Sequence, residues 1–150
     1  MRTPVIVGNW KMNMTPSEAK SLLEELVELD LDKSVEKGVC VPAVDLLLAS
    51  EILKDSDIKF GAQNMYFEES GAFTGEISPK MLNDIKADYV ILGHSERREY
   101  FKEDDELINK KVLSALEHNI VPILCVGETL EEREANKQEE NVNDQLEKDL

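Results

Sequence analysis

Long apolar runs are missing from this sequence, and no stretch approaches the ~20 residues of a membrane-spanning helix. Basic residues are scarce, since 17 Lys and Arg stand against 32 Asp and Glu, which gives a formal net charge of −15. Nucleic acids and anionic membranes both attract positively charged surfaces, so this balance argues against either as a partner. An anionic ligand would need a locally positive group on this chain.

Cysteine and histidine occur only twice each. Cys40 and Cys125 lie in apolar, strand-like stretches, which predicts buried, reduced thiols in place of a disulfide or metal ligands. His94 and His118 are too few for the clustered ligands of a metal-dependent hydrolase. The N-terminus turns polar at Asn9, too early for the core of a signal peptide, which favours a cytoplasmic protein.

Short runs rich in β-branched residues recur five times, at residues 5–7, 39–41, 58–62, 89–92 and 121–126. Each run is followed by polar or glycine residues and then by a helical pattern. Strands that alternate with helices predict an α/β fold with a parallel sheet, and burial on both faces explains the unbroken apolar runs. No linker or change of composition divides the 150 residues, so we expect one domain.

Capping residues mark the expected helix starts. Thr15, followed by Pro16 and Glu18, predicts a helix that begins with a capping box. Three further helices are expected to be capped by Asp45, Ser78 and Thr129, and another is expected to run from about Asp104. We expect the helix after Thr129 to continue, with a ragged apolar pattern, to the end of the chain.

Polar residues gather after the strands, where parallel α/β folds hold their ligands. Asn9 and Lys11 follow the first strand, and Gln63 follows the third. The fourth strand ends in Gly93, after which come His94, Ser95 and Glu96. A helix that starts at Ser95 would present free N–H groups, which favour a neutral imidazole at His94 over a charged one. The spacing alone would allow Glu96 as a general base.

Several of these stretches resemble the triosephosphate isomerase family in order and spacing. They are Gly-Asn-Trp-Lys-Met-Asn at 8–13, Gln-Asn at 63–64, Gly-Glu-Ile-Ser at 75–78, Tyr-Val-Ile-Leu-Gly-His-Ser-Glu-Arg-Arg at 89–98 and Pro-Ile-Leu-Cys-Val-Gly-Glu at 122–128. The resemblance implies a (β/α)8 TIM barrel, of which this chain supplies strands one to five and most of their helices. Residues 1–150 would then be the N-terminal part of a single barrel domain.

The resemblance also implies a reaction, the cofactor-free interconversion of dihydroxyacetone phosphate and glyceraldehyde 3-phosphate through an enediolate, in glycolysis and gluconeogenesis. By family match, Lys11 binds the substrate and offsets its charge, and Asn9 orients its oxygens. His94 is the electrophile that polarises the carbonyl. Ser95 and Glu96 support the site, and Glu96 pairs with a nearby cation, Lys11 or Arg98.

This sequence departs from the family pattern in what it omits. The family's general base is a glutamate at the end of the sixth strand, within a Tyr-Glu-Pro-Val-Trp type of stretch, and that stretch is absent. The lid that follows it and the glycine-rich phosphate turns are absent too. We therefore expect the chain alone to be inactive and to need the missing C-terminal segment. The alternative is a non-catalytic half-barrel module that binds a phosphate or a partner chain.

The connection from 63 to 77 is long and carries Met65, Tyr66, Phe67 and Phe73. Apolar side chains on an exposed loop mark an interface. The resemblance implies a homodimer in which Phe73 and Thr74 dock beside the other subunit's active site. The alternative is that the aromatic residues fold back on their own subunit. A five-stranded portion should also leave the strands near Val5 and Ile123 with open edges.

Overall fold

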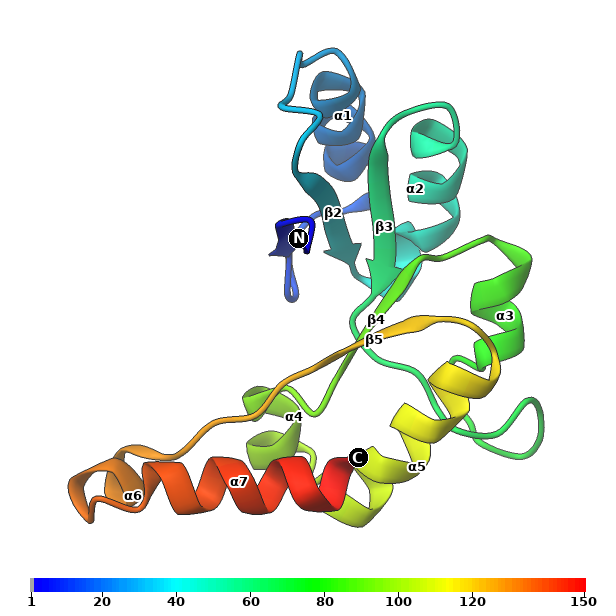
Figure 1. Cartoon of the computed structure of the whole chain (residues 1–150). Coiled ribbons are helices and arrows are strands. Elements are labelled where there is room, and N and C mark those ends of the chain that lie inside the picture. The colour runs from blue at the N-terminus through cyan, green and yellow to red at the C-terminus, as the bar shows by residue number, and fades with distance from the viewer. Residues whose placement is uncertain (1) are drawn as a thin grey trace.

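A curved sheet of five parallel strands forms the centre of the computed structural model, which describes residues 2–150 (Figure 1). The strands are β1 (Val5–Asn9), β2 (Glu36–Val41), β3 (Ile58–Ala62), β4 (Tyr89–Leu92) and β5 (Val121–Leu124), and they lie in the order β1-β2-β3-β4-β5. Every neighbouring pair is parallel. The predicted α/β fold with a parallel sheet is confirmed.

Three strand boundaries differ from the sequence pattern. β1 continues to Asn9 and β2 begins at Glu36, because polar residues pair as regular parallel neighbours, Val5 with Glu36 and Asn9 with Cys40. β5 ends at Leu124, two residues earlier than expected, where its pairing with β4 ends at Leu92. Apolar runs locate buried strand segments, whereas backbone pairing sets where each strand ends.

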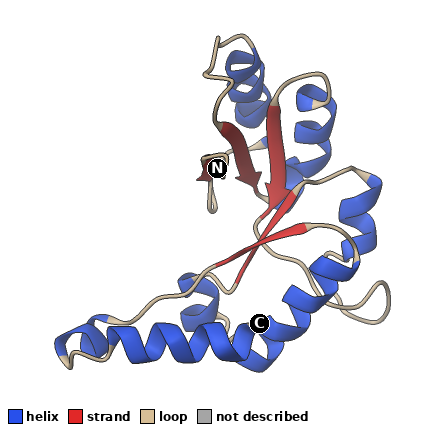
Figure 2. Ribbon diagram, in the orientation of Figure 1, coloured by secondary structure: helices blue, strands red, loops and turns tan. Residues whose placement is uncertain are grey.

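Helices flank one side of the sheet, and the last two extend away from it beyond the end of β5 (Figure 1 and Figure 2). They are α1 (Pro16–Val27), α2 (Leu46–Leu53), α3 (Pro79–Asp84), α4 (Ser95–Tyr100), α5 (Asp105–Glu117), α6 (Leu130–Glu134) and α7 (Gln138–Asp149), with a 3-10 turn η1 (Ala43–Asp45) before α2. α1 packs against α2, and the end of α7 returns to lie beside α5 (Figure 1). No helix within residues 2–150 is long and apolar enough to cross a membrane.

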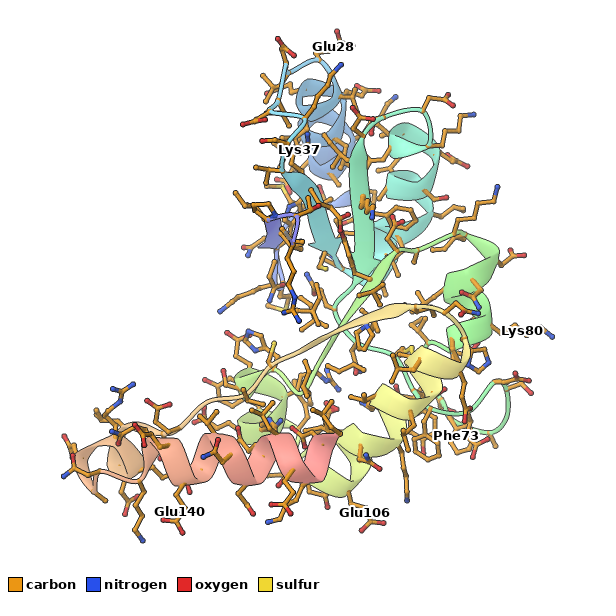
Figure 3. All side chains as sticks on the ribbon, viewed as in Figure 1. Glu28, Lys37, Phe73, Lys80, Glu106 and Glu140 are labelled. Atoms are coloured by element: carbon orange, nitrogen blue, oxygen red, sulfur yellow. The ribbon has the colours of Figure 1, made fainter. Side chains whose placement is uncertain are left out.

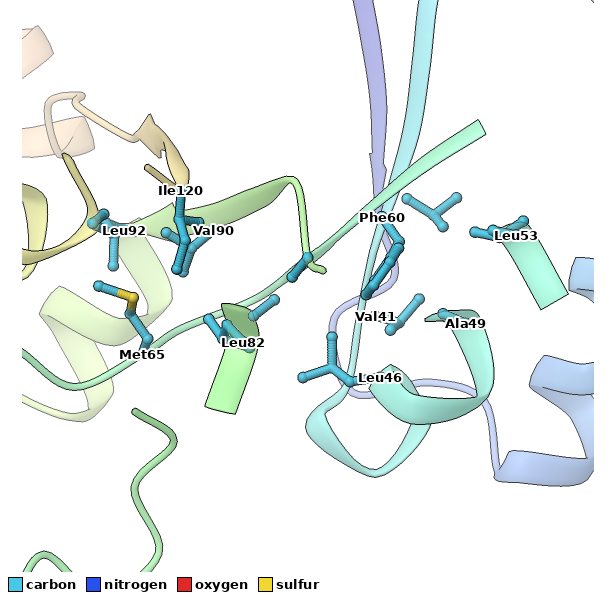
Figure 4. Close-up of a cluster of buried hydrophobic side chains, with 14 of the residues drawn as sticks. Val41, Leu46, Ala49, Leu53, Phe60, Met65, Leu82, Val90, Leu92 and Ile120 are labelled. Carbon is cyan, nitrogen blue, oxygen red and sulfur yellow. The ribbon is translucent and has the colours of Figure 1, made fainter. Parts of the chain in front are cut away.

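The main hydrophobic core lies between the sheet and these helices (Figure 4). It contains buried side chains from strands, helices and the long loop, among them Val41, Leu53, Phe60, Met65, Leu82, Val90 and Ile120. A smaller cluster of Cys40, Tyr89 and Ile91 packs with Val7 and Ile123. Most acidic side chains, such as Glu28, Glu106 and Glu140, instead project outward from the helices (Figure 3).

Both outer strands end the sheet with exposed apolar side chains. Ile6 on β1 is 66% exposed, and Val121 on β5 is 56% exposed. Neither strand has a second neighbour within residues 2–150. The expectation of open edges near Val5 and Ile123 is confirmed.

Three predicted caps are present, and Asp104, near which a helix was expected to start, caps its helix as well. Thr15 accepts a hydrogen bond from the Glu18 N–H and donates its own N–H to the Glu18 carboxylate, which completes a capping box. Thr129 and Glu132 repeat this arrangement at α6. Ser78 and Asp104 cap α3 and α5 by accepting one backbone N–H each.

The prediction for Asp45 was wrong. Asp45 directly precedes α2, but its carboxylate accepts no hydrogen bond from the N–H groups of the helix. It has no hydrogen-bond partner within residues 2–150. The reason is that η1 runs directly into α2, so Asp45 has helical backbone angles and not the extended ones of a capping residue. The side chain is fully buried, and burial raises the pKa of its carboxyl group.

The expected single helix after Thr129 was also wrong. Asn136 adopts the left-handed conformation, with φ of 57°, and divides the segment into α6 and α7. Asn tolerates this conformation better than most residues, and it commonly ends helices. Asn119, with φ of 57°, ends α5 in the same way.

Candidate active site

A cavity of about 380 Å³ opens at the carboxyl ends of the strands. Among its lining residues are Asn9 and Lys11 after β1, Gln63 after β3, and His94 and Glu96 after β4. Parallel pairing aligns these strand ends, so residues up to 87 positions apart in sequence, Asn9 and Glu96, face one space. Ser95 does not line this cavity; it borders a neighbouring one together with His94.

Lys11 and Glu96 form an ion pair in the cavity, with 2.6 Å between the Lys11 Nζ and Glu96 Oε1 atoms. The ammonium comes from the loop after β1, where the Lys11 N–H donates to Asn9 Oδ1 over 3.0 Å. The hydrogen bond from Lys11 lowers the pKa of the Glu96 carboxyl group, and the positive charge of Lys11 adds to this effect, against the opposing effect of burial. The Glu96 carboxylate is therefore ion-paired with Lys11, one of the two cations that the resemblance implied.

His94 occupies the N-cap position of α4. Its Nδ1 atom accepts the Glu96 N–H over 3.2 Å, and an accepting nitrogen carries no proton. The ring is thus a neutral imidazole whose proton sits on Nε2, where it can donate. The helix that the sequence predicted to begin at Ser95 places this N–H, because the first N–H groups of a helix have no partner within it.

Beneath the cavity lies a buried charged cluster that the sequence analysis missed. Lys111 is 2% exposed, and its Nζ atom lies 2.9 Å from Asn64 Oδ1 and 2.5 Å from Glu103 Oε1. Glu103 also pairs with Arg97, which lines the cavity. The signal was available in the sequence, since Lys111 falls between Ile108 and Ala115 on the apolar side of α5.

The sequence indicates only that Gln63 is a polar residue at a strand end, yet in the structure it bridges two other segments. Its Nε2 atom donates to the Lys11 carbonyl over 2.9 Å and to the Cys40 carbonyl over 3.1 Å. No local sequence pattern predicts these bonds, because they join residues 52 and 23 positions apart.

Phe73 and Thr74 lie outside the cavity, on the loop between β3 and α3. Phe73 is 40% exposed, and its ring packs on Tyr66 with 4.6 Å between centroids. Tyr66 stacks in turn on Phe67 at 4.4 Å. Met65 folds back into the core, whereas Thr74 is exposed.

The two thiols are free. Cys40 is fully buried, and burial, followed by the nearby Cys125, raises the pKa of its thiol to about 12. Cys125 is partly buried, and burial raises the pKa of its thiol as well. Within residues 2–150, no three His, Cys, Asp or Glu side chains are grouped so that they could hold a metal ion.

Comparison with known proteins agrees with this geometry. The family model described as "Triosephosphate isomerase" matches residues 4–150. Over 150 residues the chain is 57% identical to triosephosphate isomerase of Finegoldia magna, covering all of this chain and 60% of that protein. Over 137 residues it is 58% identical to that of Caldanaerobacter subterraneus, covering 91% of this chain and 55% of the relative.

The crystal structure of triosephosphate isomerase from Bartonella henselae superposes with a TM-score of 0.94 at 42% identity. The superposition covers 99% of this chain and 62% of that one. This chain therefore spans about 60% of the length of the relatives it matches.

Proposed function

Since the chain belongs to the triosephosphate isomerase family, we propose that it supplies the carbonyl-polarising part of an isomerase that interconverts dihydroxyacetone phosphate and glyceraldehyde 3-phosphate. The fold is a partial (β/α) barrel that corresponds to the first five βα units of the family. The observation that carries the proposal is the joint presence of the Lys11 ammonium and the neutral His94 ring in one cavity.

In this proposal the reaction begins when a proton leaves the carbon beside the substrate carbonyl. Negative charge then accumulates on the carbonyl oxygen as the enediolate forms. His94 donates its Nε2–H to that oxygen, and Lys11 provides positive charge that the −15 chain otherwise lacks. Asn9, whose Oδ1 already holds the Lys11 N–H, orients the substrate from the same strand end.

Among the described residues, Glu96 is a poor candidate for the base that removes the proton. A general base works best when its pKa lies near the working pH. Glu96 is the carboxylate beside His94, but Lys11 lowers its pKa and occupies one of its oxygens. We propose that a further segment of polypeptide supplies the base, the lid and the phosphate-binding turns, and that the chain alone is inactive.

The isolated chain should fail to exchange hydrogen between solvent and dihydroxyacetone phosphate, because nothing in it takes the carbon-bound proton. The measurement is deuterium incorporation followed by NMR, with protein free of host enzyme. A full-length protein that carries this chain serves as the positive control. Stereospecific exchange by the isolated chain that disappears in Glu96→Gln would contradict the proposal and identify Glu96 as the base.

The second candidate is a non-catalytic half-barrel that binds a phosphate or a partner chain. The observation that favours it is that the pocket and its Lys11–Glu96 ion pair are already formed by these residues. The intact mass of the natural protein, combined with an isomerase assay on that material, separates the two. We further propose that the complete enzyme is a cytoplasmic homodimer of glycolysis and gluconeogenesis.

A further inference from the structure

The backbone of Lys11 has a conformation that residues with side chains seldom adopt. Its φ is 54°, in the left-handed region, although Lys lacks the freedom of Gly. Met14, three residues later, has φ of 76°. Such conformations persist only where surrounding contacts over-determine them, and they collect at functional sites.

Main-chain bonding does not hold this segment. Trp10 makes the last ladder bond, from its N–H to the Cys40 carbonyl at 3.0 Å. Within the described chain, residues 11–14 then make no backbone-to-backbone hydrogen bond. The conformation of Lys11 must therefore depend on side chains that bind its peptide groups.

Two side chains do so, one on each side of Lys11. Asn9 Oδ1 accepts the Lys11 N–H over 3.0 Å, and Gln63 Nε2 donates to the Lys11 carbonyl over 2.9 Å. Asn9 belongs to the same strand end and moves with it. Gln63 follows β3, two strands away, and its second bond, to the Cys40 carbonyl at the end of β2, fixes the amide on the sheet.

The hydrogen bond from Gln63 to the Lys11 carbonyl matters for the Lys11 ammonium because the Lys side chain is long and flexible. Its side chain is 51% exposed, and its contact at the tip is with Glu96, which is 43% exposed. An exposed pair of this kind positions a charge weakly, since both side chains retain rotamer freedom. The backbone conformation of Lys11 sets the direction in which its side chain leaves the main chain. This direction therefore also determines where the ammonium lies.

We infer that Gln63 is a positioning residue for Lys11: its amide holds the Lys11 backbone in the left-handed conformation and so aims the ammonium into the cavity. The inference rests on the proposed function only for its kinetic consequence. Gln63 itself needs no contact with the substrate. Small misplacements of catalytic groups cost about 100-fold in rate, so loss of the bond has a measurable effect.

The test uses a full-length enzyme that carries this chain, with Gln63→Met and Gln63→Glu. Met keeps the length of Gln but cannot donate, and kcat/KM should fall by about 10- to 100-fold, with a raised KM and a lowered kcat. The matched control is Asn83→Leu, which removes another 2.9 Å amide-to-carbonyl bond, to His118; neither residue lines the cavity. The control should retain wild-type kinetics.

Gln63→Glu adds a readout that a purely structural role would not move. Its carboxylate cannot donate to either carbonyl, whereas its protonated form has one O–H and can restore the donation to the Lys11 carbonyl. The deficit of Gln63→Glu relative to wild type should therefore shrink as the pH falls, while that of Gln63→Met should not. A crystal structure of Gln63→Met should show Lys11 with negative φ or without an ordered conformation.

Either of two results would overturn the inference: a positive φ at Lys11 in Gln63→Met, or a kcat/KM within twofold of wild type. If the wild-type enzyme itself shows no isomerase activity, the proposed function fails. The inference is then decided by the Lys11 conformation and by the affinity for inorganic phosphate, which Gln63→Met should weaken.

Discussion

At the scale of single residues, Lys11 and His94 have different expected kinetic signatures. In the proposed reaction Lys11 faces charge that is present before and during proton transfer, so Lys11→Ala should raise KM and lower kcat. The proposed hydrogen bond from His94 strengthens mainly as the enediolate forms, so His94→Gln should lower kcat by about 10²- to 10³-fold with little change in KM. Steady-state kinetics of a complete enzyme measure both effects.

Lys20→Ala is the matched control for the loss of positive charge. Lys20 pairs with Glu24 on the exposed surface of α1, with 3.8 Å between Nζ and Oε1. Such surface pairs contribute little, so this variant should behave as wild type. Equal losses in Lys11→Ala and His94→Gln, confined to KM, would refute the separate roles.

At the scale of elements, the loop from 63 to 77 is predicted to dock a second subunit. Phe73 stays 40% exposed although it packs on Tyr66, and Thr74 beside it is exposed. Phe73→Glu and Thr74→Glu in a complete enzyme should therefore give monomers in sedimentation experiments. Leu113→Glu, at a 46% exposed position on α5, is the matched control and should leave the dimer intact. A dimer that survives both loop substitutions would exclude this loop as the docking element.

The same loop is fastened to α5 by His118. Its Nε2 atom lies 2.8 Å from Glu69 Oε1, and its Nδ1 atom lies 2.7 Å from the Ser114 carbonyl oxygen. The hydrogen bond with Glu69, then the bond with Ser114 and the charges of Glu69 and Glu117, raise the pKa of His118 against burial. Ser114 also donates its hydroxyl to the Phe67 carbonyl over 3.0 Å.

A raised pKa in the folded state gives the attachment a defined pH dependence. Its stabilisation is fully present below the ordinary His value of 6.5 and is lost as the pH rises through the raised pKa. The urea-unfolding midpoint of a complete wild-type enzyme, minus that of His118→Gln, should decrease as the pH rises from 5 toward 9. Glu69→Gln should abolish most of this pH dependence. A difference that does not change with pH would disprove the contribution of His118.

At the scale of the whole molecule, the sheet has two open edges. Ile6 and Val121 expose most of their apolar surface at these edges, and unpaired strands recruit other chains. We expect the isolated 17.0 kDa chain to self-associate or to bind a complementing segment. Light scattering with thermal unfolding tests this, with a complete barrel as the control. A compact, cooperatively unfolding monomer of 17.0 kDa would show that five βα units are sufficient.

The sequence by itself determined the parallel α/β order and the polar residues at the strand ends. It also determined the caps at Thr15, Ser78 and Thr129 and the start of a helix near Asp104. These features are local: a run of apolar residues specifies a buried strand, and a capping side chain reaches only three residues along the chain. The resemblance added the pairing of Glu96 with a cation, which the structure places on Lys11.

The tertiary structure alone decided the remaining features. Asp45 lost its predicted cap because η1 merges with α2. The left-handed Lys11, the Gln63 bridge and the buried Lys111 all depend on bonds between segments distant in sequence. Sequence patterns and residue propensities describe interactions between neighbours along the chain. A buried charge or a strained backbone is stable only when folding brings partner groups from distant segments beside it.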